Sequence, residues 1–322
     1  MTTGTSTSAQ DDGTGFRHEA LLYCGDADFV DQVGSFIRRG VEAEEPTLAV
    51  VGAAKIDLLR QELGRDAEAV TFADMAVVGC NPARIIPAWR DFVREHARPG
   101  RRLRGVGEPV FPSRTPPELV ECQRHESLLN LAFTDSPAWW LVCPYDTAAL
   151  DAEVIAEARK THPVVTESGV SRLSAEYAGL EPAGAPFQAP LPEPGTAPTE
   201  FRFDSRRLHE LRRWVAAHAR AGGLDARRTA DVVLAVNELA TNSIRHAEGD
   251  GMLLTWWDGE SFMCEVRDPG VLADPLAGRV RPADRQASGY GLWLVNHLCD
   301  LVQIRTFPSG NAIRLMMRRA TA

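Results

Sequence analysis

A proline-rich segment near the middle of the chain limits what this sequence can fold into. Residues 181–198 read EPAGAPFQAPLPEPGTAP, in which six of 18 residues are proline and half of the others are alanine or glycine. Proline fixes φ and removes a backbone donor, so this segment cannot continue a helix or a central strand. We therefore expect an extended spacer between two domains, residues 16–180 and 199–322, after a polar leader at residues 1–15.

Length and charge agree with two soluble domains. The 322 residues exceed the usual size of one domain, and no apolar run reaches the roughly 18 residues that a transmembrane helix needs. The leader has no signal-peptide pattern, so we expect a cytoplasmic protein without membrane association. The net charge of −9 divides into −11 before residue 199 and +2 from there on. Neither part has the basic surplus of a protein that binds nucleic acid directly.

The six cysteines lie far apart in the sequence and form no C-x-x-C pair. They therefore match neither a zinc signature nor a thioredoxin-like redox signature. We expect reduced and mostly buried thiols, with a sensing thiol at Cys24 as the alternative.

The first domain alternates short apolar runs with longer amphipathic ones. The apolar runs at residues 20–24, 47–52, 69–72, 103–110 and 139–144 predict buried strands. The amphipathic runs at 26–40, 53–63, 82–97, 116–132 and 147–161 predict helices. This alternation predicts a three-layer α/β domain with a mostly parallel sheet. It has no phosphate loop, because the glycine-lysine motif is missing and the first strand leads into the acidic stretch GDADFVDQV.

The same region resembles the MEDS (DcmR-like) sensory domain. The matching pieces are FRHEALLY at 16–23, RGVGEPVF at 104–111, ECQRHESLLN at 121–130, VCPYD at 142–146 and THPVV at 161–165. The resemblance implies a RecA/KaiC-like sheet without its phosphate loop, and the sensing of small, hydrocarbon-derived molecules. It makes His18, Tyr23 and Cys24 candidate sensor residues; the alternative is that His18 packs at the strand entry and Cys24 in the core. By position alone, Glu108, Tyr145 and Asp146 end predicted strands, where open α/β sheets bind ligands.

The second domain has a different pattern. A strand at 200–204 and helices at 205–220 and 225–247 precede two strands, 251–257 and 261–266. An irregular stretch, a helix at 290–299 and strands at 301–307 and 311–318 follow. Consecutive antiparallel strands with helices on one side predict a two-layer α+β sandwich.

The helix at 225–247 carries the first chemical pattern. Glu238, Asn242 and His246 are spaced i, i+4 and i+8, so they share one face of the helix. The amide oxygen of Asn242 can ligate Mg²⁺, and Glu238 can act as a general base toward a hydroxyl near that metal. His246 either contacts the nucleotide or positions the neighbouring loop.

Two glycine-containing motifs follow. Asp268 and Gly270 form a D-x-G at a strand end, where the carboxylate can accept from an adenine amino group and the glycine lets the backbone approach the base. Ser288, Gly289, Tyr290, Gly291 and Leu292 open a helix whose N–H groups can bind phosphate. The residues between the two motifs, 271–288, are expected to form a mobile lid.

In this order the three patterns resemble the N, G1 and G2 boxes of GHKL (Bergerat-fold) ATPases. VVLAVNELATNSIRHA, VRDPG and SGYGLWLVNHLCD are similar to the anti-sigma-factor serine/threonine kinases of the RsbW type. The whole arrangement resembles the RsbA-family anti-sigma regulators. The second glycine of D-x-G-x-G is absent, because Val271 and Leu272 follow Gly270; we therefore expect the geometry of the lid and the strength of ATP binding to differ from the family pattern.

The resemblance implies a signal-responsive anti-sigma factor and ATP-dependent protein serine/threonine kinase with ATP and Mg²⁺ as cofactors. Its partners would be a sigma factor and an anti-anti-sigma (STAS) protein, and the module would form homodimers. His209-Glu210-Leu211 imitates a histidine-kinase phosphoacceptor box, but only 28 residues separate His209 from Asn237, too few for a dimerisation hairpin. The alternatives are a nucleotide-binding anti-sigma module with little kinase activity and a sensor histidine kinase.

Overall fold

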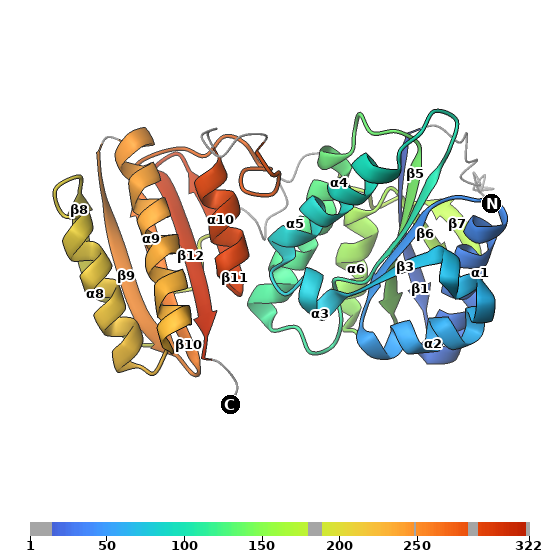
Figure 1. Cartoon of the computed structure of the whole chain (residues 1–322), viewed down its shortest axis with the longest axis horizontal. Coiled ribbons are helices and arrows are strands. Elements are labelled where there is room, and N and C mark those ends of the chain that lie inside the picture. Colours follow the sequence, from blue (N-terminus) through green and yellow to red (C-terminus); the bar gives the residue numbers. More distant parts are fainter. Residues whose placement is uncertain (1–14, 180–188, 248, 283–288, 320–322) are drawn as a thin grey trace, which may run out of the picture. The chain divides into compact units, whose positions relative to one another are not determined.

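The computed structural model describes residues 15–179, 189–247, 249–282 and 289–319. The chain divides into two compact units, which we call the N-terminal unit (Met1–Pro182) and the C-terminal unit (Ala183–Ala322). Figure 1 labels the elements of each.

The N-terminal unit is built on a seven-stranded sheet with the order β3-β2-β4-β5-β1-β6-β7. Its strands are β1 (Phe16–Tyr23), β2 (Thr47–Val51), β3 (Val70–Asp74), β4 (Leu103–Gly107), β5 (Trp139–Asp146), β6 (Val164–Glu167) and β7 (Val170–Leu173). All neighbours are parallel except β6 and β7, which form an antiparallel hairpin at the edge. Every residue of β2 and of β4 is buried, as expected for strands covered on both faces.

Helices cover both faces of this sheet (Figure 1). The helices are α1 (Gly25–Glu42), α2 (Ala53–Leu63), the short α3 (Met75–Val78), α4 (Ile85–His96), α5 (Pro116–Ala132) and α6 (Ala152–Thr161), with 3-10 segments η1 (Gly64–Ala69) and η2 (Pro82–Arg84). Leu21 and Tyr23 of β1 pack on the side of α1 and α2, whereas His18 of the same strand bonds to α5. The predicted three-layer α/β fold is confirmed.

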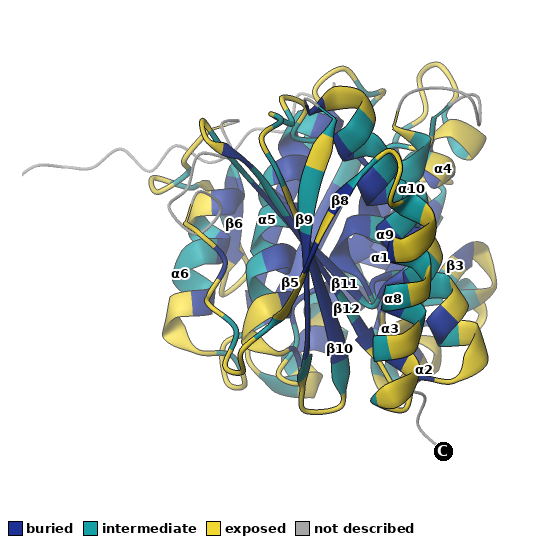
Figure 2. Cartoon of the chain, turned by 90° about the vertical axis from the view of Figure 1, so that its left-hand side faces the viewer, coloured by how far each residue is buried: buried dark blue, intermediate teal, exposed yellow. Residues whose placement is uncertain are grey.

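The C-terminal unit has two layers. Its antiparallel sheet has the order β11-β12-β10-β9-β8, from strands β8 (Thr199–Asp204), β9 (Asp250–Asp258), β10 (Ser261–Asp268), β11 (Leu301–Phe307) and β12 (Gly310–Arg318). The helices α8 (Leu208–Ala221), α9 (Ala226–His246) and α10 (Tyr290–Leu298) pack on one face, where they share a core with the strands. In Figure 2 the strands are mostly dark blue and the helices carry yellow on their outward faces. This confirms the predicted sandwich.

Three local features differ from the sequence expectations. The sequence pattern did not indicate α3 or the hairpin of β6 and β7. Helix α1 begins at Gly25, one residue before the predicted start, with Cys24 as its N-cap, and the carboxylate of Asp28 accepts from the Cys24 N–H at 2.8 Å. The described part of the proline-rich segment runs along the sheet of the C-terminal unit, where Arg314 donates to the carbonyl of Pro192 at 2.8 Å.

Candidate functional site

Helix α9 presents the predicted polar face beside a buried one. Val236 and Leu239 are 1% exposed and anchor the helix in the core of the unit. This packing leaves Glu238 and Asn242 half-buried and His246 exposed at the end of the helix. The helix begins where the Asp225 carboxylate accepts from the Arg228 N–H at 2.7 Å, which satisfies one of the free donors of the first turn.

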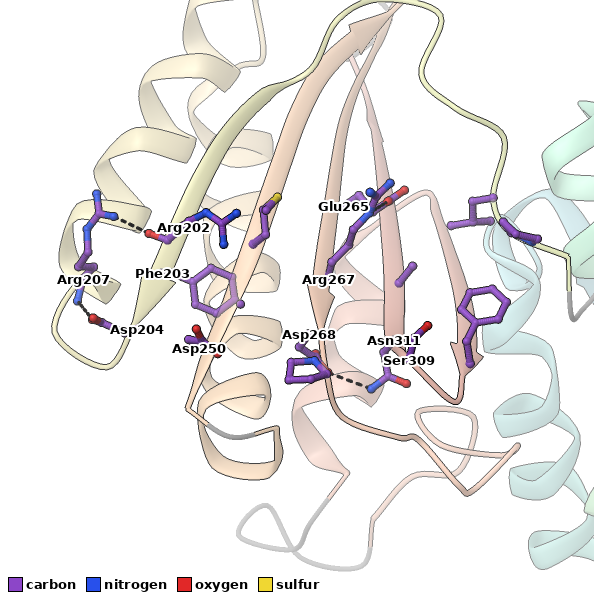
Figure 3. A pocket seen from close by; sticks show the side chains of 18 of the residues that line it. Arg202, Phe203, Asp204, Arg207, Asp250, Glu265, Arg267, Asp268, Ser309 and Asn311 are labelled. Atoms are coloured by element: carbon purple, nitrogen blue, oxygen red, sulfur yellow. Dashed lines mark hydrogen bonds and ion pairs between the residues drawn. The ribbon is translucent and has the colours of Figure 1, made fainter.

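Asp268, the last residue of β10, is fixed in orientation by three donors. Ser243 of α9 donates its hydroxyl to Oδ2 at 2.7 Å. The Gly270 N–H and the Asn311 amide donate to Oδ1 at 2.9 and 3.1 Å, and Figure 3 shows the second of these bonds. A carboxylate oxygen can accept two hydrogen bonds, so Oδ2 keeps capacity for one more donor besides Ser243.

Two glycines allow close approach around these side chains. A Cβ on Gly270 would lie 2.8 Å from the Ala247 Cβ and 2.9 Å from Asp268 Oδ1. A Cβ on Gly291, in the first turn of α10, would lie 2.8 Å from Glu238 Oε2 and 3.4 Å from Asn242 Nδ2. The start of α10 therefore passes directly beside the polar face of α9.

A cavity of about 590 Å³ lies between α9, the end of β10, the loop after it and α10. Its predicted lining residues are Asn242, His246, Asp268, Gly270, Gly289 and Leu292. Glu238 and Gly291 lie next to each other but outside this lining, and Tyr290 packs its ring against Trp293. Ser288 lies outside the described residues. The structure thus gathers most of the predicted nucleotide residues, which stay candidates for that role.

The described part of the predicted lid, residues 271–282, closes one side of this cavity. Leu272 donates its N–H to Asn311 Oδ1 at 3.2 Å, and Asn296 of α10 donates to the Gly278 carbonyl at 2.9 Å. Leu272 takes the position of the missing glycine and packs against the core of the unit, while Val271 is exposed. This stretch is therefore tied to β12 and α10.

Sequence reasoning missed Ser243 and Asn311. Ser243 directly follows Asn242 on α9, and helical geometry turns it toward the sheet rather than along the polar face. Asn311 pairs with Asp268 across β10 and β12, a register that the sequence pattern alone does not give.

A second hollow, of about 600 Å³, lies on the other face of the same sheet (Figure 3). Charged side chains dominate it, among them Arg202, Asp250, Glu265 and Arg267. It shares Asp268 and Asn311 with the inner cavity, but no described residue of α9 or α10 lines it. The predicted chemistry is therefore concentrated in the inner cavity.

The candidate sensor residues of the N-terminal unit do not form one group. Tyr23 is buried, donates to Glu108 Oε1 at 2.9 Å and contacts Lys55. Burial, followed by the charge of Glu108, raises the pKa of Tyr23 far above its ordinary value. His18 points to the opposite face of the sheet, toward α5, and Cys24 is exposed at the start of α1. Their sensing role stays a prediction.

At the turn from β1 to α1, two backbone N–H groups already have acceptors within the protein. In a phosphate loop the N–H groups at this position point at the anion. Here the Gly25 N–H donates to Asp146 Oδ1 at 3.1 Å, and the Cys24 N–H donates to Asp28. Two of the protein's own carboxylates thus occupy the place of the phosphate.

Comparison with protein families gives the class of each unit. Residues 17–163 match the MEDS family, the methanogen/methylotroph, DcmR sensory domain. Residues 201–317 match the histidine kinase-like ATPase domain. The chain therefore contains a MEDS domain followed by a histidine kinase-like ATPase domain, which confirms these two resemblances.

Two of the solved structures with similarity to the chain each match less than two fifths of it. The RsbU and RsbW domains of Rv1364c from Mycobacterium tuberculosis are 18% identical over 39% of this chain, with a TM-score of 0.30. The histidine kinase AdeS from Acinetobacter baumannii is 12% identical over 38% of this chain, with a TM-score of 0.24. The matched parts span 35% of the first structure and 68% of the second. A search of curated proteins gave no match.

None of the helices in the described part of the chain is both long enough and apolar enough to cross a membrane.

Proposed function

We propose that this protein is an ATP- and Mg²⁺-dependent kinase that phosphorylates serine or threonine on a separate partner protein. The observation that supports this most directly is the cavity in which Asp268, Asn242 and the glycine-led start of α10 come together. The histidine kinase-like ATPase family gives independent support for a nucleotide at this position.

Asp268 would bind the adenine ring. Asp268 lines the cavity, and its Oδ2 can accept one hydrogen bond more than the bond from Ser243, which an adenine amino group would supply. Gly270 leaves the space beside the carboxylate open, because any side chain there would collide with Ala247. Leu239, Leu272 and Ile313 supply apolar walls for the base.

The phosphates would lie at the start of α10. Gly289 has φ of +96°, so its backbone turns into the helix in a conformation that favours glycine, and the first N–H groups of the helix lack intrahelical partners. Asn242 can hold Mg²⁺ through its amide oxygen, and the ion would neutralise charge on the phosphates. Glu238 lies beside Gly291 and would accept the proton of the attacking hydroxyl.

The phosphate acceptor would be on another protein. His209 is exposed on α8, which packs against α9 within the same compact unit instead of standing on a separate helical hairpin. The resemblance to RsbW-type kinases then supports an anti-anti-sigma (STAS) protein as the substrate and a sigma factor as the captured partner. The MEDS domain would bias this switch through a small molecule, and the kinase module would pair as a homodimer.

A phosphotransfer assay with the full chain tests this proposal. The protein is incubated with γ-labelled ATP, Mg²⁺ and a candidate anti-anti-sigma protein. We expect acid-stable label on the partner, lost in Glu238→Gln while nucleotide binding persists. Glu210→Gln, an exposed carboxylate on α8, is the matched control and should transfer normally.

Two other outcomes would overturn the kinase proposal. Nucleotide binding and sigma-factor capture without transfer would show a binding module with little kinase activity. Acid-labile label on His209 would show a histidine kinase.

A further inference from the structure

Four metal-ligating side chains meet inside the N-terminal unit, away from the candidate nucleotide cavity. His18 comes from β1, Glu126 from α5, Cys143 from β5, and His162 from the segment between α6 and β6. All four are buried, with exposures of 1% or less. Their ligand atoms lie within 4.8 Å of one another.

The distances between these ligand atoms are close to those between the ligand atoms of a tetrahedral zinc site. His18 Nε2 lies 3.0 Å from Glu126 Oε2 and 3.4 Å from Cys143 Sγ. Glu126 Oε2 lies 3.5 Å from Cys143 Sγ and 3.4 Å from His162 Nε2. Zinc bonds of about 2.0–2.3 Å at tetrahedral angles place neighbouring ligand atoms roughly 3.3–3.7 Å apart. The cluster therefore needs only small shifts to surround an ion.

The outer hydrogen bonds direct both histidines toward the cluster. Asn130 donates its amide N–H to the Thr161 carbonyl at 2.8 Å, so its Oδ1 faces His18 Nδ1 at 3.0 Å and accepts from it. His162 Nδ1 donates to the Ala158 carbonyl at 2.8 Å. With Nδ1 protonated in both rings, each Nε2 presents a lone pair to the cluster, as in metal-bound histidines.

Without a cation these groups are poorly matched. Two ring lone pairs and a carboxylate then converge, with the Cys143 thiol as the nearest donor. The buried His162 Nε2 has no hydrogen-bond partner among the described residues.

We propose that His18, Glu126, Cys143 and His162 bind one Zn²⁺ ion. Two imidazoles and a thiolate favour zinc over Mg²⁺ or Ca²⁺, which take oxygen ligands. Binding replaces the thiol proton of Cys143, which leaves to solvent, and involves no change of oxidation state. Four protein ligands close the coordination sphere, so the ion would join α5 to β1, β5 and the chain after α6 as a structural centre.

The first test is the metal content of the full-length protein. We expect about one zinc per chain by mass spectrometry of the metals, after gel filtration without added metal. Protein depleted by a chelator should take up Co²⁺ with the intense visible bands and the thiolate charge-transfer band of tetrahedral coordination. A preparation that holds no stoichiometric metal and gives no such spectrum overturns the proposal.

Variants then assign the ligands. Cys143→Ala and His162→Gln should each lower the zinc content at least tenfold. Cys143→Ala should also remove the thiolate band, and His162→Gln should alter the cobalt spectrum. Cys122→Ala, at a buried cysteine on α5 whose thiol bonds to the Pro109 carbonyl, is the matched control and should keep full metal content. Retention of zinc and of the thiolate band in Cys143→Ala would contradict the assignment of Cys143 as a ligand. If a variant does not fold, the cobalt spectrum of the wild-type protein decides whether the cluster binds a metal.

Discussion

At the residue scale, the orientation of Asp268 is the feature on which nucleotide recognition would depend. Three donors hold its carboxylate in place, and they come from α9, from β12 and from its own turn. A side chain fixed in this way loses little conformational entropy when a ligand binds, so its remaining acceptor can discriminate between bases.

We expect Asp268→Asn to weaken ATP binding by roughly 10- to 150-fold. The substitution removes a charged hydrogen-bond acceptor, which contributes about 1.5–3 kcal/mol. Isothermal titration calorimetry with ATP and Mg²⁺ gives the dissociation constant. Asp258→Asn, at an exposed carboxylate at the end of β9, serves as the control; equal affinities of the two variants would argue against adenine recognition by Asp268.

Gly291→Ala should separate catalysis from stability. The new methyl group would lie 2.8 Å from Glu238 Oε2 and push that carboxylate away from its position. Alanine favours a helix by up to about 1 kcal/mol over glycine, so the melting temperature should stay level or rise. We expect phosphotransfer to fall at least tenfold, and Gly195→Ala, where a Cβ meets open space, to keep wild-type activity. Unchanged transfer in Gly291→Ala would show that the Glu238 carboxylate has no part in the reaction.

At the element scale, α9 connects the stability of the C-terminal unit to its chemistry. Its 21 residues run from the Asp225 cap to the predicted site residues near the other end. Glu238 lies 13 residues after the cap, or about three and a half turns of helix, which at 1.5 Å per residue is about 20 Å.

Asp225→Ala should therefore destabilise the C-terminal unit by about 0.5–2 kcal/mol, the usual effect of removing an N-cap. Nucleotide affinity at a temperature where the unit is folded should change less than twofold. Denaturant unfolding followed by circular dichroism measures the first quantity and calorimetric titration the second. If the free energy of nucleotide binding falls by more than the free energy of unfolding, the helix shifts as a whole when its cap is removed.

At the scale of the whole molecule, each unit has its own hydrophobic core, and we have proposed a different ligand for each. Differential scanning calorimetry of the full chain should show two transitions. ATP with Mg²⁺ should raise the midpoint temperature of the transition of the C-terminal unit. At a nucleotide concentration 100 times the dissociation constant, the free energy of unfolding of this unit should increase by about 2.7 kcal/mol. A chelator should lower the transition of the N-terminal unit. A single transition that moves with both ligands would contradict this division.

The sequence predicted the parts of the molecule that depend on local patterns. Helical spacing placed Glu238 and Asn242 on one face, and strand and helix periodicity gave both layer architectures. Asn311 could not be found in this way, because its place beside Asp268 depends on the register of β12.

The cluster of His18, Glu126, Cys143 and His162 could not be predicted for the same reason. Its members come from positions 18, 126, 143 and 162, and the cysteines alone show no metal-binding spacing. Only the parallel pairing of β1 with β5, covered by α5, brings them together.

The short strands β6 and β7 were not predicted, because strands of four residues contain too few positions for a periodic pattern.

The turn between β1 and α1 has a consequence for signalling. Asp28 and Asp146 accept from two of its N–H groups, so an incoming phosphate would have to displace negative charge that belongs to the protein. At this turn a nucleotide would therefore compete poorly with the small molecule that we propose as the signal of the N-terminal unit. Under the proposed function, the N-terminal unit would then respond to its signal independently of the energy charge of the cell, while the C-terminal unit would respond to ATP.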